Sequence, residues 1–290
     1  MLNFSTRNRL LPLLLWTLLT PAPATTEEVD QSAFSVEMIR DISYAQKQSP
    51  HPRQHLDLFI PRNAQKPTPV LVFVHGGSWR SGNKTFYLML GRAFARQGIL
   101  TAIIGYRLSP EVKHPAHAQD VAQALNWVYR NAAKHNGNPQ EIFLCGHSAG
   151  GHLAALIALD DRYLQVHDLS PTIFRGVIPI SGVYRIDSGR WYDMAFPRQG
   201  RDQASPMHHT RKDRPPFLVL WAEEEAINLV KQGRDFVRSL KKSEVPVKAI
   251  EIPNRNHITI IVGAVFPNDP LHRAIVSFIK RTVAPQSRNH

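Results

Sequence analysis

The sequence predicts an α/β fold with a mostly parallel central sheet and helices on both of its faces. From about residue 54 to residue 283, short apolar runs alternate with amphipathic segments of helical length, an order that is typical of βα units. Several of the apolar runs are continuous, as strands buried on both faces of a sheet require. No repeat, low-complexity tract or linker follows residue 32, so we expect a single domain over residues 25–290.

The individual elements follow from the periodicity of the apolar residues. Residues 54–60 alternate and end at Pro61, and residues 70–74 are uniformly apolar, so both are predicted strands. Residues 184–214 are rich in Arg, Asp, Pro and Gly, and we expect there either a cap over a site or a long surface connection. Further strands are predicted at residues 99–105, 141–145, 177–181, 217–221 and 247–252, and helices at residues 86–97, 120–134, 149–159, 229–241 and 271–283.

The first residues have the order of a secretory signal peptide. Arg7 and Arg9 precede an apolar run at residues 10–19, and residues 22–24 (Ala-Pro-Ala) form a small-residue cleavage site. The run is too short to cross a bilayer, which takes about 20 residues, and an uncleaved anchor is the alternative interpretation. We therefore expect a signal peptide at residues 1–24, a secreted or periplasmic protein, and no stable membrane insertion after cleavage.

Composition narrows the class of protein further. Hydrophobic residues make up 43% and charged residues 20% of the chain, which excludes a disordered, collagen-like or polytopic membrane protein. The formal net charge is +12, but the basic residues are scattered and form no nucleic-acid-binding motif. We expect a solvated basic face, with loose adhesion to an anionic surface as the alternative. The single cysteine, Cys145, excludes an intramolecular disulfide, and the His208-His209 pair has no third ligand at metal spacing.

A G-x-S-x-G sequence identifies Ser148 as a candidate nucleophile. It lies between a predicted strand and a predicted helix, which is the context of a nucleophile elbow. The sharp turn of an elbow leaves no room for side chains two residues away on either side, and Gly146 and Gly150 meet this requirement. The N-terminus of the following helix would favour negative charge developing beside the serine. The alternative is a glycine-rich turn that holds a solvated serine.

A second glycine-rich segment, HGGSW, begins at His75 and follows a predicted buried strand. The transition state of acyl transfer carries an oxyanion, which needs converging hydrogen-bond donors. By position we expect the N–H groups of Gly77 and Ser78 to be the loop donors, with Gly76 forming the turn and His75 holding the loop by hydrogen bonds. The N–H of Ala149, directly after the nucleophile, would be a further donor.

Together these motifs make the sequence resemble the α/β-hydrolase superfamily, and within it the branch of carboxylesterases and arylformamidases (kynurenine formamidases). That branch is marked by an H-G-G-x-W loop, matched at residues 75–79, and by a G-x-S-A-G-G-H elbow, matched at residues 146–152. The resemblance covers roughly residues 35–283. Further matches are Ser205-Pro206, the Pro-Pro-strand segment at residues 215–220, and Gln232.

The resemblance implies an α/β-hydrolase fold, a Ser-acid-His triad in that chain order, and no metal or organic cofactor. The sequence departs from the family pattern at two places. Ser78 stands where many relatives have a third glycine, and residues 222–225 (Ala-Glu-Glu-Glu) stand where the acid loop usually opens with Gly and carries Asp.

The family's chain order assigns the remaining triad members. The base should follow the last core strand, where His257 ends the loop after residues 247–252. The acid should follow the strand at residues 217–221, and alignment from the helix that comes next selects Glu225, with Glu224 and Glu223 as alternatives. Among the competing histidines, His147 and His152 are expected to point into the sheet or along the helix, and His114 and His117 to be loop or capping residues.

The predicted function is a serine hydrolase that cleaves carboxylic esters of small substrates through an acyl-enzyme intermediate. Its partner would be a small-molecule ester, with no nucleic acid. An arylformamidase uses the same machinery on an N-formyl amide and is the first alternative, although export argues against an enzyme of intracellular tryptophan breakdown. The second alternative is a catalytically inactive binding protein of the same fold.

Overall fold

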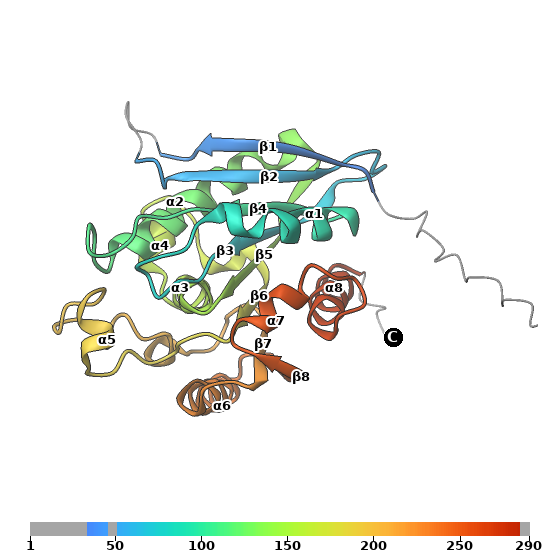
Figure 1. Cartoon of the computed structure of the whole chain (residues 1–290). Helices are drawn as coiled ribbons and strands as arrows, with labels where there is room; N and C mark the ends of the chain where they lie inside the picture. The colour runs from blue at the N-terminus through green and yellow to red at the C-terminus, as the bar shows by residue number, and fades with distance from the viewer. Residues whose placement is uncertain (1–33, 46–50, 285–290) are drawn as a thin grey trace, which may run out of the picture. The chain divides into compact units, whose positions relative to one another are not determined.

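The computed structural model describes residues 34–45 and 51–284, so the predicted signal peptide at residues 1–24 lies outside the described residues. The described residues contain an eight-stranded sheet with the order β1-β2-β4-β3-β5-β6-β7-β8. Strand β2 runs antiparallel to both β1 and β4, whereas the other neighbours pair in parallel. Figure 1 shows β1 and β2 at one edge of the sheet and β8 at the other. The predicted mostly parallel sheet is confirmed.

The predicted strands are all present, with ends that differ by a few residues. One strand was not predicted: in β1 the pairing shifts between Ile39 and Ile42, and Asp41 has a φ of 56°. This bulge interrupts the alternation by which a strand is detected in a sequence. The strands are β1 (Val36–Ser43), β2 (His55–Pro61), β3 (Thr68–Val74), β4 (Leu100–Ile104), β5 (Gly137–His147), β6 (Phe174–Ile180), β7 (Phe217–Glu224) and β8 (Val247–Asn256).

The five long predicted helices are also present. The largest difference is in α2, which begins at Ala116 rather than at residue 120. The α-helices are α1 (Leu88–Arg96), α2 (Ala116–Asn131), α3 (Ala149–Leu159), α4 (Arg162–Gln165), α5 (Arg190–Asp193), α6 (Ile227–Lys242), α7 (Thr259–Gly263) and α8 (Pro270–Val283), and the 3₁₀ turns are η1 (Lys84–Tyr87), η2 (Ala132–His135), η3 (Pro171–Ile173) and η4 (Pro206–His209).

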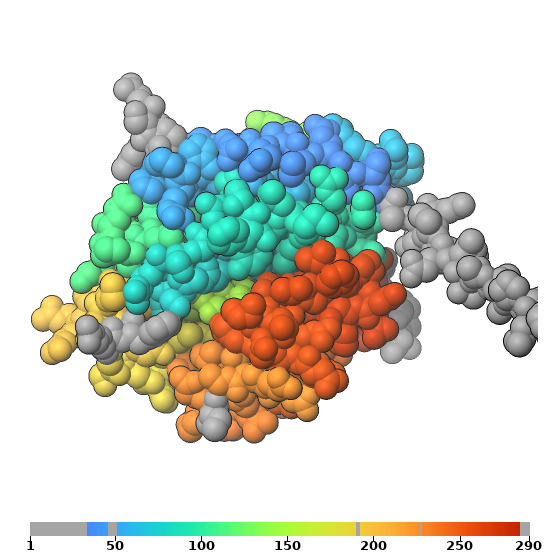
Figure 2. All heavy atoms as spheres, in the orientation of Figure 1, coloured from blue at the N-terminus to red at the C-terminus, as the bar shows by residue number. Residues whose placement is uncertain are grey.

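Two separate apolar clusters show which helices cover which face of the sheet. Helices α2, α3 and α6 contribute to the larger cluster, and α1, α7 and α8 contribute to the smaller one on the opposite face. Phe94 of α1 stacks on His272 of α8, with ring centroids 4.7 Å apart, and Figure 2 shows these two segments side by side on the surface. None of the described helices is long and apolar enough to span a bilayer.

This arrangement positions the candidate site. Strands β3, β5, β7 and β8 all run parallel, so their carboxyl ends meet at one edge of the sheet. In open α/β sheets this edge is where ligands bind. The HGGSW segment, the G-x-S-x-G sequence, the three glutamates and His257 each lie at or just beyond one of these ends.

Candidate active site

Ser148 occupies a strained turn between β5 and α3. Its φ and ψ are 55° and −117°, outside the conformations that a residue with a side chain ordinarily adopts. A Cβ atom at Gly146 would lie 2.3 Å from the carbonyl oxygen of Gly150, and one at Gly150 would lie 2.0 Å from that of Val74. The turn is therefore closed by glycines at both positions, as the elbow interpretation predicts.

Gly150→Ala is expected to lower the free energy of unfolding by about 3 kcal/mol, the upper end of the range for overpacking, because the new methyl group meets backbone that cannot move freely. Urea unfolding would measure it. Gly233→Ala in α6 is the matched control, since its Cβ would lie 3.4 Å from the Trp221 ring. We expect that variant to match or exceed wild-type stability by up to about 1 kcal/mol. Wild-type stability of Gly150→Ala would contradict this account of the elbow.

The structure brings three distant side chains into one hydrogen-bonded chain. Nε2 of His257 lies 3.0 Å from Oγ of Ser148. Nδ1 of the same ring lies 2.9 Å and 3.0 Å from the two carboxylate oxygens of Glu225. Ser148 follows β5, Glu225 follows β7, and His257 lies between β8 and α7. This is the arrangement in which a histidine can take the proton of a serine hydroxyl while a carboxylate orients it.

Of the three consecutive glutamates, Glu225 is the one whose carboxylate contacts His257. Its side chain is fully buried and also accepts the N–H of Ala226 at 3.1 Å. Burial alone would raise the pKa of Glu225, but the hydrogen bonds it accepts, chiefly from His257, hold that pKa below the ordinary value. Glu223 instead accepts the N–H of Asn254 at 2.8 Å, and Glu224 is exposed and lines the cleft.

His147 has a role that the sequence interpretation missed. It was expected to point into the sheet, but its Nε2 lies 2.9 Å from the backbone carbonyl oxygen of His257, and the two rings are 4.9 Å apart. Burial lowers the pKa of His147 to about 3, so the ring is neutral near pH 7 and donates an N–H to that carbonyl. The residue before the candidate nucleophile thus holds the backbone of the candidate base. A histidine inside a G-x-S-x-G sequence was the available signal.

The HGGSW segment forms a tight turn beside the elbow. The turn begins at Gly77, whose carbonyl accepts the N–H groups of Arg80 and Ser81 at 3.0 Å and 2.9 Å, so the expectation that Gly76 forms it was wrong by one residue. Gly77 has a φ of 120°, and a Cβ there would lie 2.2 Å from the carbonyl oxygen of Ser81. Gly76 packs instead against the elbow, where its Cβ would lie 3.2 Å from that of Ser148.

Two of the three residues expected to donate to the oxyanion line the cleft. Ser78 and Ala149 both line the cleft that Ser148 opens into, and Gly77 is not among the described residues that line it. His75, whose pKa burial lowers to about 4, donates from Nδ1 to the carbonyl of Gly76 at 2.7 Å. These contacts fit the structural role expected for His75.

The cleft has a volume of about 740 Å³ and is lined by both apolar and polar side chains. Although the chain has a net charge of +12, no lysine or arginine is among the described residues that line it, while two carboxylates are. The lining is mixed in chemistry. Its apolar and aromatic side chains include Trp79, Val183, Tyr192, Leu229 and Ile258, and its polar side chains include Glu224, Asn228, Asn256 and Thr259.

The segment over residues 184–214 supplies Tyr192 to this cleft and is tied to the body of the domain. The side-chain oxygen of Gln232 accepts the N–H groups of Tyr184 and Arg185 at 2.8 Å and 2.9 Å. Within the segment itself, the hydroxyl of Ser205 accepts the N–H of Ile186 at 2.9 Å. The segment therefore borders the cleft on one side and carries the short elements α5 and η4.

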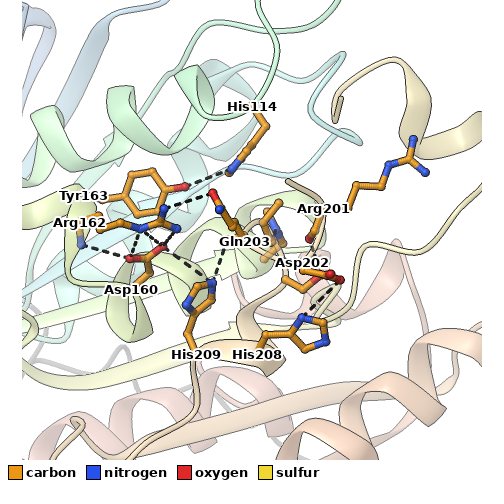
Figure 3. A network of polar contacts seen from close by, with 12 residues as sticks. His114, Asp160, Arg162, Tyr163, Arg201, Asp202, Gln203, His208 and His209 are labelled. Carbon is orange, nitrogen blue, oxygen red and sulfur yellow. Dashed lines mark hydrogen bonds and ion pairs between the residues drawn. The ribbon is translucent and has the colours of Figure 1, made fainter. Parts of the chain in front are cut away.

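Three further histidines bond to groups outside the chain of Ser148, His257 and Glu225. His117 was expected in a loop or at a cap, but it lies within α2, where it is buried with Nε2 3.1 Å from the hydroxyl of Ser109. His208 and His209 contact separate carboxylates, at 3.6 Å from Asp202 and 3.8 Å from Asp160 (Figure 3). Among the described residues, no three His, Cys, Asp or Glu side chains are grouped to hold a metal ion.

Comparison with solved structures identifies the architecture. A truncated carbohydrate esterase from gut microbiota superposes with a TM-score of 0.71 at 19% identity, over 87% of this chain and 98% of that one. Esterase B of Lactobacillus rhamnosis, in a structure with a tributyrin phosphonate, gives a TM-score of 0.72 at 22% identity, over 85% and 86% of the two chains. The chain has the α/β-hydrolase fold. A family model described as BD-FAE also matches residues 56–173 of the chain.

Proteins similar in sequence to this chain are named as esterases. It is 32% identical over 260 residues to esterase LipC of Mycobacterium tuberculosis, across 79% of this chain and 62% of that protein. It is 34% identical over 219 residues to the probable carboxylic ester hydrolase LipM of the same organism, across 68% and 50%. The chain therefore spans less than two thirds of the length of these relatives.

Proposed function

We propose that this α/β-hydrolase is a serine hydrolase that cleaves carboxylic esters of small substrates through an acyl-enzyme intermediate. The observation that carries the proposal is the hydrogen-bonded chain from Ser148 through His257 to Glu225, with steps of 3.0 Å and 2.9 Å. It opens into a cleft of about 740 Å³, large enough for a small ester. The names of the relatives LipC and LipM support the ester chemistry.

The proposed reaction begins when Oγ of Ser148 attacks the ester carbonyl carbon and its proton passes to Nε2 of His257. The carbonyl electrons move onto the oxygen, where the N–H groups of Ser78 and Ala149, the two expected donors that line the cleft, stabilise the charge. The C–O bond then breaks and the alcohol leaves with the proton from His257. Water, deprotonated by His257, attacks the acyl group and releases the acid. Glu225 stabilises the protonated imidazole in both halves.

The charges around the cleft favour neutral substrates. Glu224 is exposed at the cleft, and within the described lining neither lysine nor arginine is present to pair with a substrate carboxylate. A carboxylate of the substrate that lay close to Glu224 would be repelled by it. A neutral acyl group would instead contact the apolar side chains that line the cleft. We therefore infer a preference for esters whose acyl and alcohol parts carry no negative charge.

Glu224→Gln tests this preference. We expect wild-type kcat/KM to be about 10-fold higher for p-nitrophenyl butyrate than for p-nitrophenyl hemisuccinate, which adds one carboxylate at similar size. The variant should narrow that ratio about 3-fold, because one exposed charge at high dielectric contributes about 1 kcal/mol or less. Glu141→Gln is the control and should leave the ratio unchanged, because Glu141 lies inside β5 and is not among the described residues that line the cleft. An equal ratio in wild type and Glu224→Gln would contradict the inference.

A panel of short acyl esters against N-formylkynurenine separates the ester hydrolase from an arylformamidase. The proposal predicts that kcat/KM for the best neutral ester exceeds that for N-formylkynurenine by at least about 100-fold. The substrate's amino acid carboxylate finds no cationic side chain in the described lining of the cleft. A higher value for N-formylkynurenine would overturn the esterase assignment. Hydrolysis of neither substrate class would favour the inactive binding protein.

We also propose that the protein is exported, on the strength of the signal-like order of residues 1–24. Expressed with its leader in a bacterial host, the protein should accumulate outside the cytoplasm. Intact mass and N-terminal sequencing should place the mature start at Thr25. A cytoplasmic product that still begins at Met1 would contradict export.

A further inference from the structure

The loop that carries the Ser78 N–H is strained at two consecutive positions. Ser78 and Trp79 have φ values of 55° and 58°, a region that residues other than glycine rarely adopt. Such a conformation persists only where the surroundings over-determine it. The backbone on either side of Ser78 is fixed at two points: Gly77 begins the turn, and the carbonyl of Trp79 accepts the N–H of Ser109 at 2.9 Å.

The side chain of Trp79 provides a third fixed point. The indole is almost fully buried, and its Nε1–H donates to Nδ1 of His152 at 3.1 Å. The second ring nitrogen of His152, Nε2, lies 2.7 Å from the backbone carbonyl oxygen of Ala204. Since an indole N–H can only donate, Nδ1 of His152 must be the acceptor and Nε2 must carry the proton. Both ring nitrogens of a fully buried histidine are thus used, in one tautomer.

His152 is suited to a fixed role of this kind. It lies on the first turn of α3, four residues after Ser148, and so belongs to the element that also carries the nucleophile. Burial lowers its pKa to about 3, so the ring stays neutral at any pH at which the protein is expected to act. Phe196 packs edge-on against both Trp79 and His152, at centroid distances of 4.7 Å and 5.5 Å, which further limits movement of either ring.

The peptide group of Ala204, whose carbonyl accepts the hydrogen bond from His152, is itself held in place by its neighbours. The side chain of Gln203 accepts a hydrogen bond from Arg162 at 3.2 Å, and its backbone carbonyl lies 2.9 Å from Nε2 of His209. Figure 3 shows Gln203 beside both of these side chains. The hydroxyl of Ser205 donates to the carbonyl of Arg201 at 2.8 Å. The carbonyl of Ala204 therefore belongs to a segment whose neighbouring residues are fixed by several hydrogen bonds.

We propose that His152 is a positioning residue that holds Trp79, and through it the Ser78 N–H, in the orientation that the oxyanion requires. The inference rests on the proposed function, because it assigns His152 to the same site. The bridge also links the oxyanion loop to the segment over residues 184–214, since one histidine bonds to both. The side chain of His152 bonds to Trp79 and to the carbonyl of Ala204 and acts on the reaction only through the Ser78 N–H. Because the oxyanion develops in the transition state, the loss of His152 should lower kcat more than it changes KM.

The test compares His152→Leu, His152→Asn and Trp79→Phe with wild type on p-nitrophenyl butyrate. We expect His152→Leu to lower kcat by about 10- to 100-fold, less than the 10²–10³-fold typical of deleting an oxyanion donor, with KM changed less than about 3-fold. His152→Asn keeps an acceptor near the indole and should recover part of the loss. Trp79→Phe should lower kcat similarly, and the double variant His152→Leu with Trp79→Phe should lose little more.

Inhibition by a trifluoromethyl ketone distinguishes a positioning role of His152 from a role in packing alone. The adduct of this inhibitor with the serine is a tetrahedral oxyanion, so its affinity depends on the oxyanion donors. Its inhibition constant should rise by the same factor by which kcat falls. The control is His272→Leu, which removes a buried histidine that bonds to the carbonyl of Ala264 on the opposite face of the sheet. That variant should keep wild-type kcat to within about 3-fold.

A failure of the proposed esterase function and a failure of the inference about His152 give different results. If wild type hydrolyses no ester, the proposed function fails before His152 is tested. If wild type is active, the inference is overturned by a folded His152→Leu variant with wild-type kcat. It is also overturned if kcat falls while the inhibition constant stays unchanged. If His152→Leu does not fold, His152→Asn and Trp79→Phe decide by the same two measurements.

Discussion

Replacing Ser148 by alanine is expected to lower kcat for p-nitrophenyl butyrate by about 10⁴–10⁶-fold, because the variant has no Oγ atom to attack the carbonyl carbon. Some rate enhancement over water should remain, since the oxyanion donors and the cleft are untouched. The melting temperature should stay close to that of wild type, because Ala fits wherever the Ser148 side chain does. Initial rates at saturating substrate and a thermal unfolding curve measure the two quantities.

Ser81→Ala is the matched control for this prediction. Ser81 is an exposed serine whose hydroxyl donates to the carbonyl of Gly77 at 3.0 Å, and it lies outside the chain that activates Ser148. We expect its variant to keep kcat within about 5-fold of wild type. Retention of most activity by Ser148→Ala would remove the mechanism, whatever Ser81→Ala does.

The serine was predictable because its requirements are local. An elbow needs small residues at fixed offsets between a strand and a helix, and all of these are visible in consecutive letters around Ser148. His257 and Glu225 lie 109 and 77 residues further along the chain, and their selection depended on family order rather than on spacing. What the sequence could not supply was the contact itself: only the folded backbone shows that Glu225, and not Glu223 or Glu224, faces His257.

Replacing Glu225 by glutamine is expected to lower kcat by about 10⁴-fold, the effect of substituting the orienting acid by its amide in a serine triad. The amide can present an N–H to Nδ1 of His257, which favours the wrong tautomer, and it cannot stabilise the protonated imidazole. Glu224→Gln is the closest possible control, because it makes the same chemical change one residue earlier. It should keep kcat on the neutral butyrate ester to within about 3-fold.

The pH dependence of stability gives Glu225 a second, independent readout. Because its folded-state pKa is held below the ordinary value, the ionised carboxylate stabilises the folded state at pH values above the ordinary glutamate pKa. That stabilisation is lost as the pH falls through the lowered value. The difference in unfolding free energy between wild type and Glu225→Gln should therefore shrink on acidification from pH 7 toward pH 3 in urea titrations. A difference that grows would contradict this environment for Glu225.

The fold was predictable where hydrophobic periodicity is strong and was missed where backbone irregularity interrupts it. The buried strand β3 and the helix α3 carry uninterrupted patterns, and α3 has the predicted ends. Strand β1 lost its alternation to a bulge at Asp41. The roles of His147 and His152 depend on neighbours more than 50 residues away in the sequence. The motif could mark His147 as worth attention, but no local pattern could show which groups either ring contacts.

The central claim is that Ser148 is the nucleophile of an active hydrolase, and covalent labelling tests it most directly. A fluorophosphonate probe should add one phosphonyl group per chain, peptide mapping should place it on Ser148, and activity should fall in step with labelling. Glu225→Gln should label much more slowly, and Ser148→Ala should not label. An active enzyme that stays unlabelled, or that carries the adduct on a different residue, would contradict the account.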